Sequence, residues 1–132
     1  MRIVLDTNVI VSAFHFHGSV QEVVDIMVSG EDTWLVSPFI LWEVDRVLAD
    51  KFGWSLAEQQ ALKSWITGHA NIVEPTDVPD DIKVDSSDNH ILAAAWAGQA
   101  DLIVSGDSKH LLPLGQWRGI PLLPPRAFLD TR

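Results

Sequence analysis

The sequence predicts an α/β protein in which helices cover both faces of a parallel sheet. Five short apolar runs alternate with longer stretches in which apolar residues recur every three or four positions. These runs are almost entirely apolar, which is typical of strands buried on both faces of a parallel sheet. The length of 132 residues suits one domain, so we expect residues 1–132 to form a single unit.

Each expected element rests on a local signal. The strands are the apolar runs at residues 3–5, 34–36, 71–73, 102–104 and 120–123. The helices show helical apolar spacing at residues 19–29, 38–51, 55–67 and 86–96, and a short helix around Ala127 closes the chain. Gly30 ends the first helix, while Ser37 and Pro38 are the N-cap and first residue of the second. Pro121 places the last strand at an edge of the sheet, and the Pro/Asp-rich run at 74–85 predicts a surface loop.

Composition narrows the class of protein further. The chain has no cysteine, which excludes disulfides, thiolate metal sites and a cysteine nucleophile. It lacks a long apolar stretch, and its N-terminus reaches Asp6 after a short apolar run, so we expect no signal peptide, no membrane span and a cytoplasmic protein. The net charge of −9 disfavours contact with nucleic acid, unless several acids gather where divalent cations neutralise them.

Four acidic residues are expected near one end of the sheet. Asp6 follows the first strand, Asp107 follows the fourth strand after a short turn, Asp88 lies in the first turn of the alanine-rich helix, and Glu43 lies in the second turn of the helix 38–51. Ligand sites of such sheets lie at the carboxyl ends of the strands. Carboxylates brought together raise one another's pKa, a cost that divalent cations remove. Because these positions include no histidine, the pattern favours Mg²⁺ or Mn²⁺ over Zn²⁺.

Four segments, in order, resemble the PIN-domain family of metal-dependent ribonucleases, especially the VapC-like toxins of toxin–antitoxin pairs. The segments are Ile-Val-Leu-Asp-Thr-Asn-Val at 3–9, Ser-Pro at 37–38 with the helix that carries Glu43, Asp-Ser-Ser-Asp-Asn-His at 85–90, and Ile-Val-Ser-Gly-Asp at 103–107. The resemblance implies a three-layer α/β/α sandwich with a central parallel sheet of strand order 3-2-1-4-5. It also implies hydrolysis of RNA phosphodiester bonds and an antitoxin protein as partner.

The resemblance also implies roles for individual residues. Asp6, Glu43, Asp88 and Asp107 would hold one or two Mg²⁺ or Mn²⁺ ions, with Asn8 and Ser105 in supporting polar roles. Asp85 is a further candidate ligand, which either joins through a water or only caps the helix. Such ions can activate a water and stabilise the leaving oxygen of a phosphodiester.

Other residues are candidates for contact with partners. His15 and His17, in the loop expected after the first strand, and Lys109 are candidate substrate contacts. Trp42, close to Glu43, is a candidate for a homodimer surface, because tryptophan is enriched at interfaces. Two other functions stay open: a catalytically silent binding module, and a phosphatase that forms an aspartyl-phosphate on Asp6. Such phosphatases generally need a second acid two residues on, where this chain has Asn8.

Overall fold

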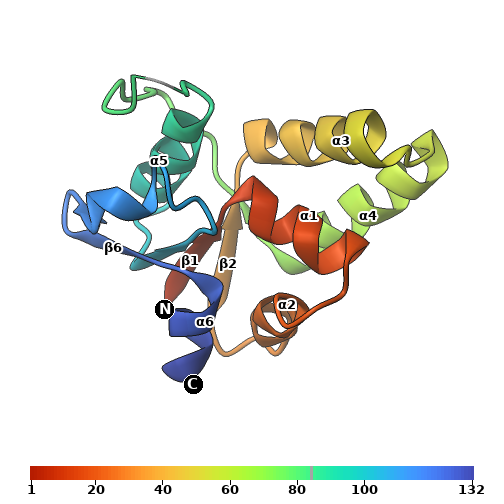
Figure 1. The fold of residues 1–132 in the computed structure, drawn as a ribbon, viewed down its shortest axis with the longest axis horizontal. Helices are drawn as coiled ribbons and strands as arrows, with labels where there is room; N and C mark the ends of the chain where they lie inside the picture. The colour runs from red at the N-terminus through yellow and green to blue at the C-terminus, as the bar shows by residue number, and fades with distance from the viewer. Residues whose placement is uncertain (84) are drawn as a thin grey trace.

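The computed structural model describes residues 1–83 and 85–132, and a six-stranded sheet forms its centre (Figure 1). The strands are β1 (Arg2–Leu5), β2 (Thr33–Val36), β3 (Asn71–Ile72), β4 (Leu102–Val104), β5 (Gln116–Trp117) and β6 (Ile120–Leu123). Their order is β3-β2-β1-β4-β6-β5, and only the β5–β6 pair is antiparallel. The predicted order 3-2-1-4-5 is confirmed for the parallel strands, with β6 as the fifth.

Strand β5 was not predicted, and it changes the place of the last predicted strand. A two-residue turn joins β5 to β6, and both turn residues have positive φ, 50° at Arg118 and 82° at Gly119. The predicted edge position of Pro121 is wrong, because β6 lies between β4 and β5. The proline is tolerated because pairing with β4 begins only at Leu122, and Pro121 faces Gln116 of the short strand β5.

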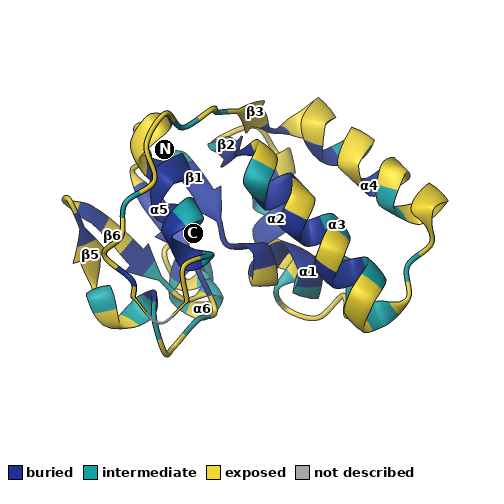
Figure 2. Cartoon of the chain, turned by 90° about the horizontal axis from the view of Figure 1, so that it is seen from above, coloured by how far each residue is buried: buried dark blue, intermediate teal, exposed yellow. Residues whose placement is uncertain are grey.

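Helices cover the sheet on both faces. They are α1 (Thr7–His15), α2 (Gln21–Val28), α3 (Pro38–Phe52), α4 (Leu56–His69), α5 (Asp88–Ala97) and α6 (Pro125–Asp130). Helix α5 packs against β1 and β2, whereas right-handed crossovers place α1 to α4 on the opposite face, where α6 packs against α2. Figure 2 shows the buried strand β1 with α5 on one side and α2 and α3 on the other. The predicted three layers are therefore confirmed.

Helix α1 is the largest difference from the sequence-based prediction. The segment after β1 was expected to be a loop carrying His15 and His17, but it is helical from Thr7 to His15. The β-branched residues Val9, Ile10 and Val11 have weak helix propensity, yet all three are buried as α1 packs against α2 and α3. Tertiary packing therefore overrides the local preference, and His15 lies in the last turn of a helix.

Two polar arrangements fix the carboxyl end of the sheet. The Ser37 side chain accepts a hydrogen bond of 3.2 Å from the Ile40 N–H and caps α3, as predicted. The Asn89 side-chain amide donates to the Ile82 carbonyl at 2.8 Å and accepts from its N–H at 3.0 Å, which ties the predicted surface loop to α5. Residue 84 of that loop lies outside the described residues. No helix among residues 1–83 and 85–132 is long and apolar enough to cross a membrane.

Candidate metal centre

The pairing of β1 with β4 brings the first and fourth predicted acids together. Asp6 directly follows β1, and its backbone N–H donates to the Val104 carbonyl at 2.9 Å. Ser105, fully buried after β4, donates from Oγ to Asp6 Oδ2 at 2.7 Å. The Ser105 Oγ also accepts a hydrogen bond of 3.0 Å from the backbone N–H of Asp107. Ser105 therefore links the two acids.

Helix α3 supplies Glu43 to the same end of the sheet. Glu43 is buried, and its Oε1 accepts a hydrogen bond of 2.6 Å from Thr7 Oγ1 at the start of α1. Its Oε2 lies 3.8 Å from Nη2 of Arg46, a side chain that is about half exposed. The sequence-based list of site residues did not include Thr7. Its signals in the sequence are its hydroxyl directly after Asp6 and its place in the segment Ile-Val-Leu-Asp-Thr-Asn-Val at 3–9.

Asp88 carries a buried carboxylate oxygen without a hydrogen-bond partner. Among the described residues, Asp88 Oδ2 has no partner of hydrogen-bond geometry, although it lies 3.3 Å from His110 Nδ1. The same nitrogen lies 3.6 Å from Asp107 Oδ2. His110, three residues after Asp107, thus enters the acidic cluster. The absence of histidine no longer argues for Mg²⁺ or Mn²⁺, because the His110 nitrogen could also act as a ligand; the preference has to rest on the number of carboxylates instead.

Asp85 also reaches this cluster. Asp85, Asp88 and His110 each offer a ligand atom within 4.8 Å of the others. Oδ1 of Asp85 in addition accepts the Ser87 N–H at 3.1 Å and the Ser87 hydroxyl at 2.6 Å, which stabilises the turn before α5. The arrangement is compatible with both roles considered for Asp85, a ligand and a helix cap.

Burial and mutual repulsion perturb the carboxylates. Burial is the main reason that the pKa of Asp6 is raised to about 6, and the charges of Asp107 and Glu43 add to it. The hydrogen bond from Ser105 opposes this rise. Since each ionised carboxylate here disfavours the next, the cluster carries an electrostatic cost that a cation would relieve.

The effect of burial and charge repulsion on the pKa is largest for Asp88, which lies beside Asp107. Burial, the hydrogen bond to Asp107 and nearby negative charges raise the pKa of Asp88 to about 8. Burial pushes the pKa of Asp107 upward, but the N–H groups of Lys109 and His110, which its Oδ1 accepts at 2.9 and 3.1 Å, help to bring a net lowering. The raised pKa favours the protonated form of Asp88 near neutral pH in the metal-free protein, whereas the lowered pKa favours ionised Asp107.

The remaining predicted residues differ in how close they lie to the acids. Asn8 is exposed in the first turn of α1, and Lys109 is exposed two residues after Asp107. His15 is not with the acids: its ring stacks on Phe52 at 4.0 Å, and its Nδ1 accepts from Trp54 Nε1 at 3.2 Å. His17 is exposed beyond the end of α1, so the structure does not bring the two histidines into the cluster.

These residues fit a hard divalent cation. The donor set is rich in carboxylate oxygens from four separate chain segments, which is the chemistry that Mg²⁺ and Mn²⁺ prefer. The buried, unpartnered Asp88 Oδ2 and the raised pKa values of Asp6 and Asp88 are the features expected of ligands described without their ion.

The fold and the acidic centre define this chain as a PIN domain. The family model described as PIN domain matches residues 2–109, so the chain belongs to that family. PIN domains are in general nucleases and generally use divalent metal ions.

Two solved structures share the fold. VapBC2 from Rickettsia felis, bound to a DNA fragment from its promoter, gives a TM-score of 0.68 at 17% identity, over 94% of this chain and 98% of that chain. FitAcB from Neisseria gonorrhoeae gives 0.58 at 15% identity, over 94% and 98% of the two chains. No curated protein sequence matches this chain.

Proposed function

We propose that this protein is a metal-dependent ribonuclease that hydrolyses RNA phosphodiester bonds, and that it is the toxin of a toxin–antitoxin pair. The observation that carries the proposal is the meeting of Asp6, Glu43, Asp88 and Asp107, from four separate segments, at the carboxyl end of the sheet. Membership of the PIN-domain family supports nuclease chemistry. The likeness to VapBC2 and FitAcB supports an antitoxin partner.

The chain's own residues prepare the site for this chemistry. Asp6, Asp88 and Asp107, with Glu43, would hold one or two Mg²⁺ or Mn²⁺ ions, which when bound neutralise phosphate charge and make water more acidic. Ser105 fixes the orientation of Asp6, and the threonine that follows Asp6 fixes Glu43. The proton on Asp88 must leave before this carboxylate can act as a ligand.

A cleavage assay with matched variants tests the proposal. A single-stranded RNA oligonucleotide should be cut in the presence of Mg²⁺ or Mn²⁺ and protected by EDTA. Asp6→Asn should lower the rate on the order of 100-fold, because it removes a ligand charge. Asp25→Asn, an exposed aspartate on α2, should cut like the wild type.

Three results would contradict the proposal in different ways. Full activity of Asp6→Asn would remove the carboxylate mechanism. A covalent phosphate on Asp6 would identify a phosphatase, and intact RNA with measurable binding would identify a silent module.

A toxin role in the cytoplasm has its own test. Expression of the wild type in bacteria should arrest growth, and expression of Asp6→Asn should not. Equal growth of both strains would separate the nuclease from any toxin role.

A further inference from the structure

Three aromatic rings form a row beside the carboxylates, where α3 meets α5. The rings of His90 and Phe39 are stacked, with centroids 3.7 Å apart and planes at 10°. The Phe39 ring lies 5.5 Å from that of Trp42, which is 54% exposed. The Arg46 guanidinium lies 5.4 Å from the Trp42 ring centroid. We call His90, Phe39 and Trp42 the aromatic strip.

The strip adjoins the candidate metal centre through α3. Phe39 lies one turn before Glu43 on α3, so the two residues share one side of that helix. The Arg46 guanidinium connects the strip and the centre directly, because it lies 3.8 Å from Glu43 Oε2 and 5.4 Å from the centroid of the Trp42 ring. A cavity of about 320 Å³ opens beside the two stacked rings, with mainly apolar walls that include Pro75. A nucleotide held at the carboxylates would therefore have an aromatic surface next to it.

The charge of the protein gives an aromatic surface a clear use in an RNA-cutting enzyme. With a net charge of −9, the chain offers little of the positive surface that holds phosphates. Stacking of bases on aromatic rings gives affinity that does not depend on that surface, and it tolerates any base because every base has a π-face. An arginine over the ring strengthens this kind of binding.

We propose that the aromatic strip stacks the bases of an RNA strand whose phosphate lies at the carboxylates, with Trp42 as the main positioning residue. The proposal rests on the proposed function and extends it, because it names the residues that hold the strand beside the cleaved bond. It also favours a single strand, since the bases of a duplex are already stacked on each other.

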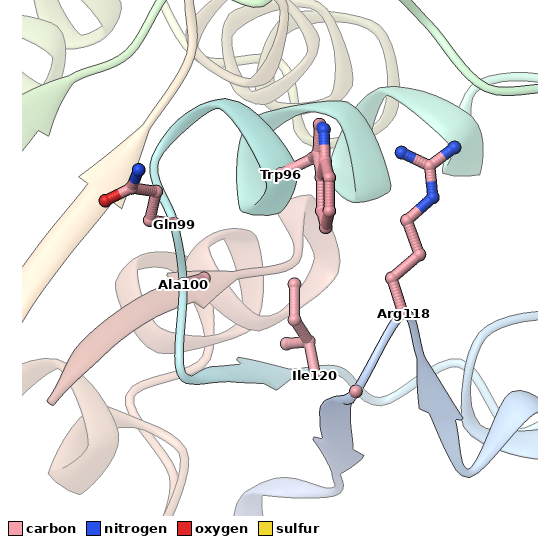
Figure 3. Close-up of a pocket in the computed structure, with 6 residues that line it drawn as sticks. Trp96, Gln99, Ala100, Arg118 and Ile120 are labelled. Atoms are coloured by element: carbon pink, nitrogen blue, oxygen red, sulfur yellow. The ribbon is translucent and has the colours of Figure 1, made fainter.

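A larger cavity at the other end of α5 supplies a control. This cavity, of about 460 Å³, lies between Trp96, Gln99 and Ile120, with Arg118 nearby (Figure 3). Trp96 is 55% exposed and lies 4.7 Å from the Arg118 guanidinium, much like Trp42 and its arginine. It is about 12 Å along the helix axis from Asp88, too far for the base next to a phosphate at the acids. Trp96→Ala therefore removes an equally exposed tryptophan without touching the strip.

The test measures binding in the inactive Asp6→Asn protein. Fluorescence anisotropy with Mg²⁺ would follow a labelled RNA of about 12 nucleotides, single-stranded or annealed to its complement. Adding Trp42→Ala should weaken single-strand binding about 10-fold, which corresponds to a stacking energy of about 1.4 kcal/mol. Trp42→Phe should restore most of the loss, and Trp96→Ala should have no effect. Duplex binding should not depend on Trp42.

Abasic substrates separate stacking from a structural role. Abasic nucleotides placed at each position in turn should include one that weakens binding to Asp6→Asn. With that oligonucleotide, adding Trp42→Ala should cause no further loss, because the stacking partner is already gone. A further loss equal to that seen with intact RNA would overturn the proposal.

Other outcomes also decide the matter. Equal losses for Trp42→Ala and Trp96→Ala, or no loss for either, would overturn the proposal while leaving cleavage intact. If Trp42→Ala splits a dimer in light scattering without weakening RNA binding, the strip is a surface between copies of the chain. If no RNA is cut under any condition but binding follows Trp42, the strip proposal stands and the ribonuclease proposal fails.

Discussion

Replacing Asp6 by asparagine should stabilise the metal-free protein at neutral and alkaline pH. Asp6 is 3% exposed, and burial raises its pKa from 3.8 to about 6. A rise of about two units corresponds to at most about 3 kcal/mol of destabilisation once the carboxyl is ionised. Asparagine carries no charge, and its side-chain oxygen can still accept the hydrogen bond from Ser105. The variant should therefore keep the fold without the destabilisation that a buried, ionised carboxylate causes.

The direction of the pH effect follows from the sign of the shift. The pKa of Asp6 is higher in the folded than in the unfolded chain. The contribution of Asp6 to the free energy of unfolding is therefore fully present below pH 3.8 and is lost as the pH rises through about 6. The pKa of Asp88, raised mainly by burial to about 8, extends the same fall to higher pH. The lowered pKa of Asp107 acts in the opposite sense, with a loss only as the pH falls through its folded value.

Urea unfolding in EDTA tests this reasoning. Between about pH 5 and about pH 8 the wild type should lose free energy of unfolding, and at the higher pH Asp6→Asn should exceed it by about 1–3 kcal/mol. The exposed Asp25→Asn should follow the wild type, and saturating Mg²⁺ should restore the wild type at high pH. Equal wild-type stability at both pH values, or a less stable Asp6→Asn at high pH, would refute the reasoning.

Three further predictions concern the site and the packing beneath it. Glu43→Gln keeps an acceptor but loses a charge, so RNA cleavage should fall on the order of 10- to 100-fold. The unfolding midpoint should not fall below that of the wild type, because a charge that raises the pKa of Asp6 is gone; unaltered cleavage would exclude Glu43 from the centre. Ser105→Ala removes the donor that lowers the pKa of Asp6, so the acid limb of the pH–rate profile should move to higher pH, and an unmoved limb would contradict this coupling. Gly98→Ala would place Cβ 2.7 Å from a β2 leucine and should cost about 1–3 kcal/mol in thermal unfolding, whereas Gly68→Ala, in open space on α4, should cost nothing; equal effects would show that this close contact is unimportant.

The sequence was sufficient for the elements whose apolar pattern is unambiguous. Strands β1, β2 and β4 are short, apolar and almost completely buried, so their pattern reflects their position in the sheet. The segment of helix α1 was expected to be a loop, because its central Val-Ile-Val run at 9–11 has weak helix propensity; packing against α2 and α3 outweighs that propensity. Strand β5 was not predicted, because its two residues carry no apolar pattern of their own and pair with β6 through the turn at Arg118 and Gly119.

The acids of the candidate site were predictable, but their partners were not. Asp6 and Asp107 follow strands whose pairing was implied by the resemblance to the PIN-domain family, whereas the apolar pattern alone predicted only a parallel sheet. Thr7 and His110 acquire their roles from side-chain contacts across α1, α3 and α5, and no periodic signal marks such contacts. His15 was predicted to contact substrate, but its ring stacks on Phe52 away from the acids.

Calorimetric titration with Mn²⁺ near neutral pH tests most directly whether the four carboxylates act as one metal centre. The wild type should bind one or two ions and release protons, since Asp88 must give up the one it holds. Asp88→Asn should bind on the order of 10- to 100-fold more weakly, and Asp25→Asn should match the wild type. No Mn²⁺ uptake at millimolar concentration, or unchanged affinity in Asp88→Asn, would contradict a metal centre built from these residues.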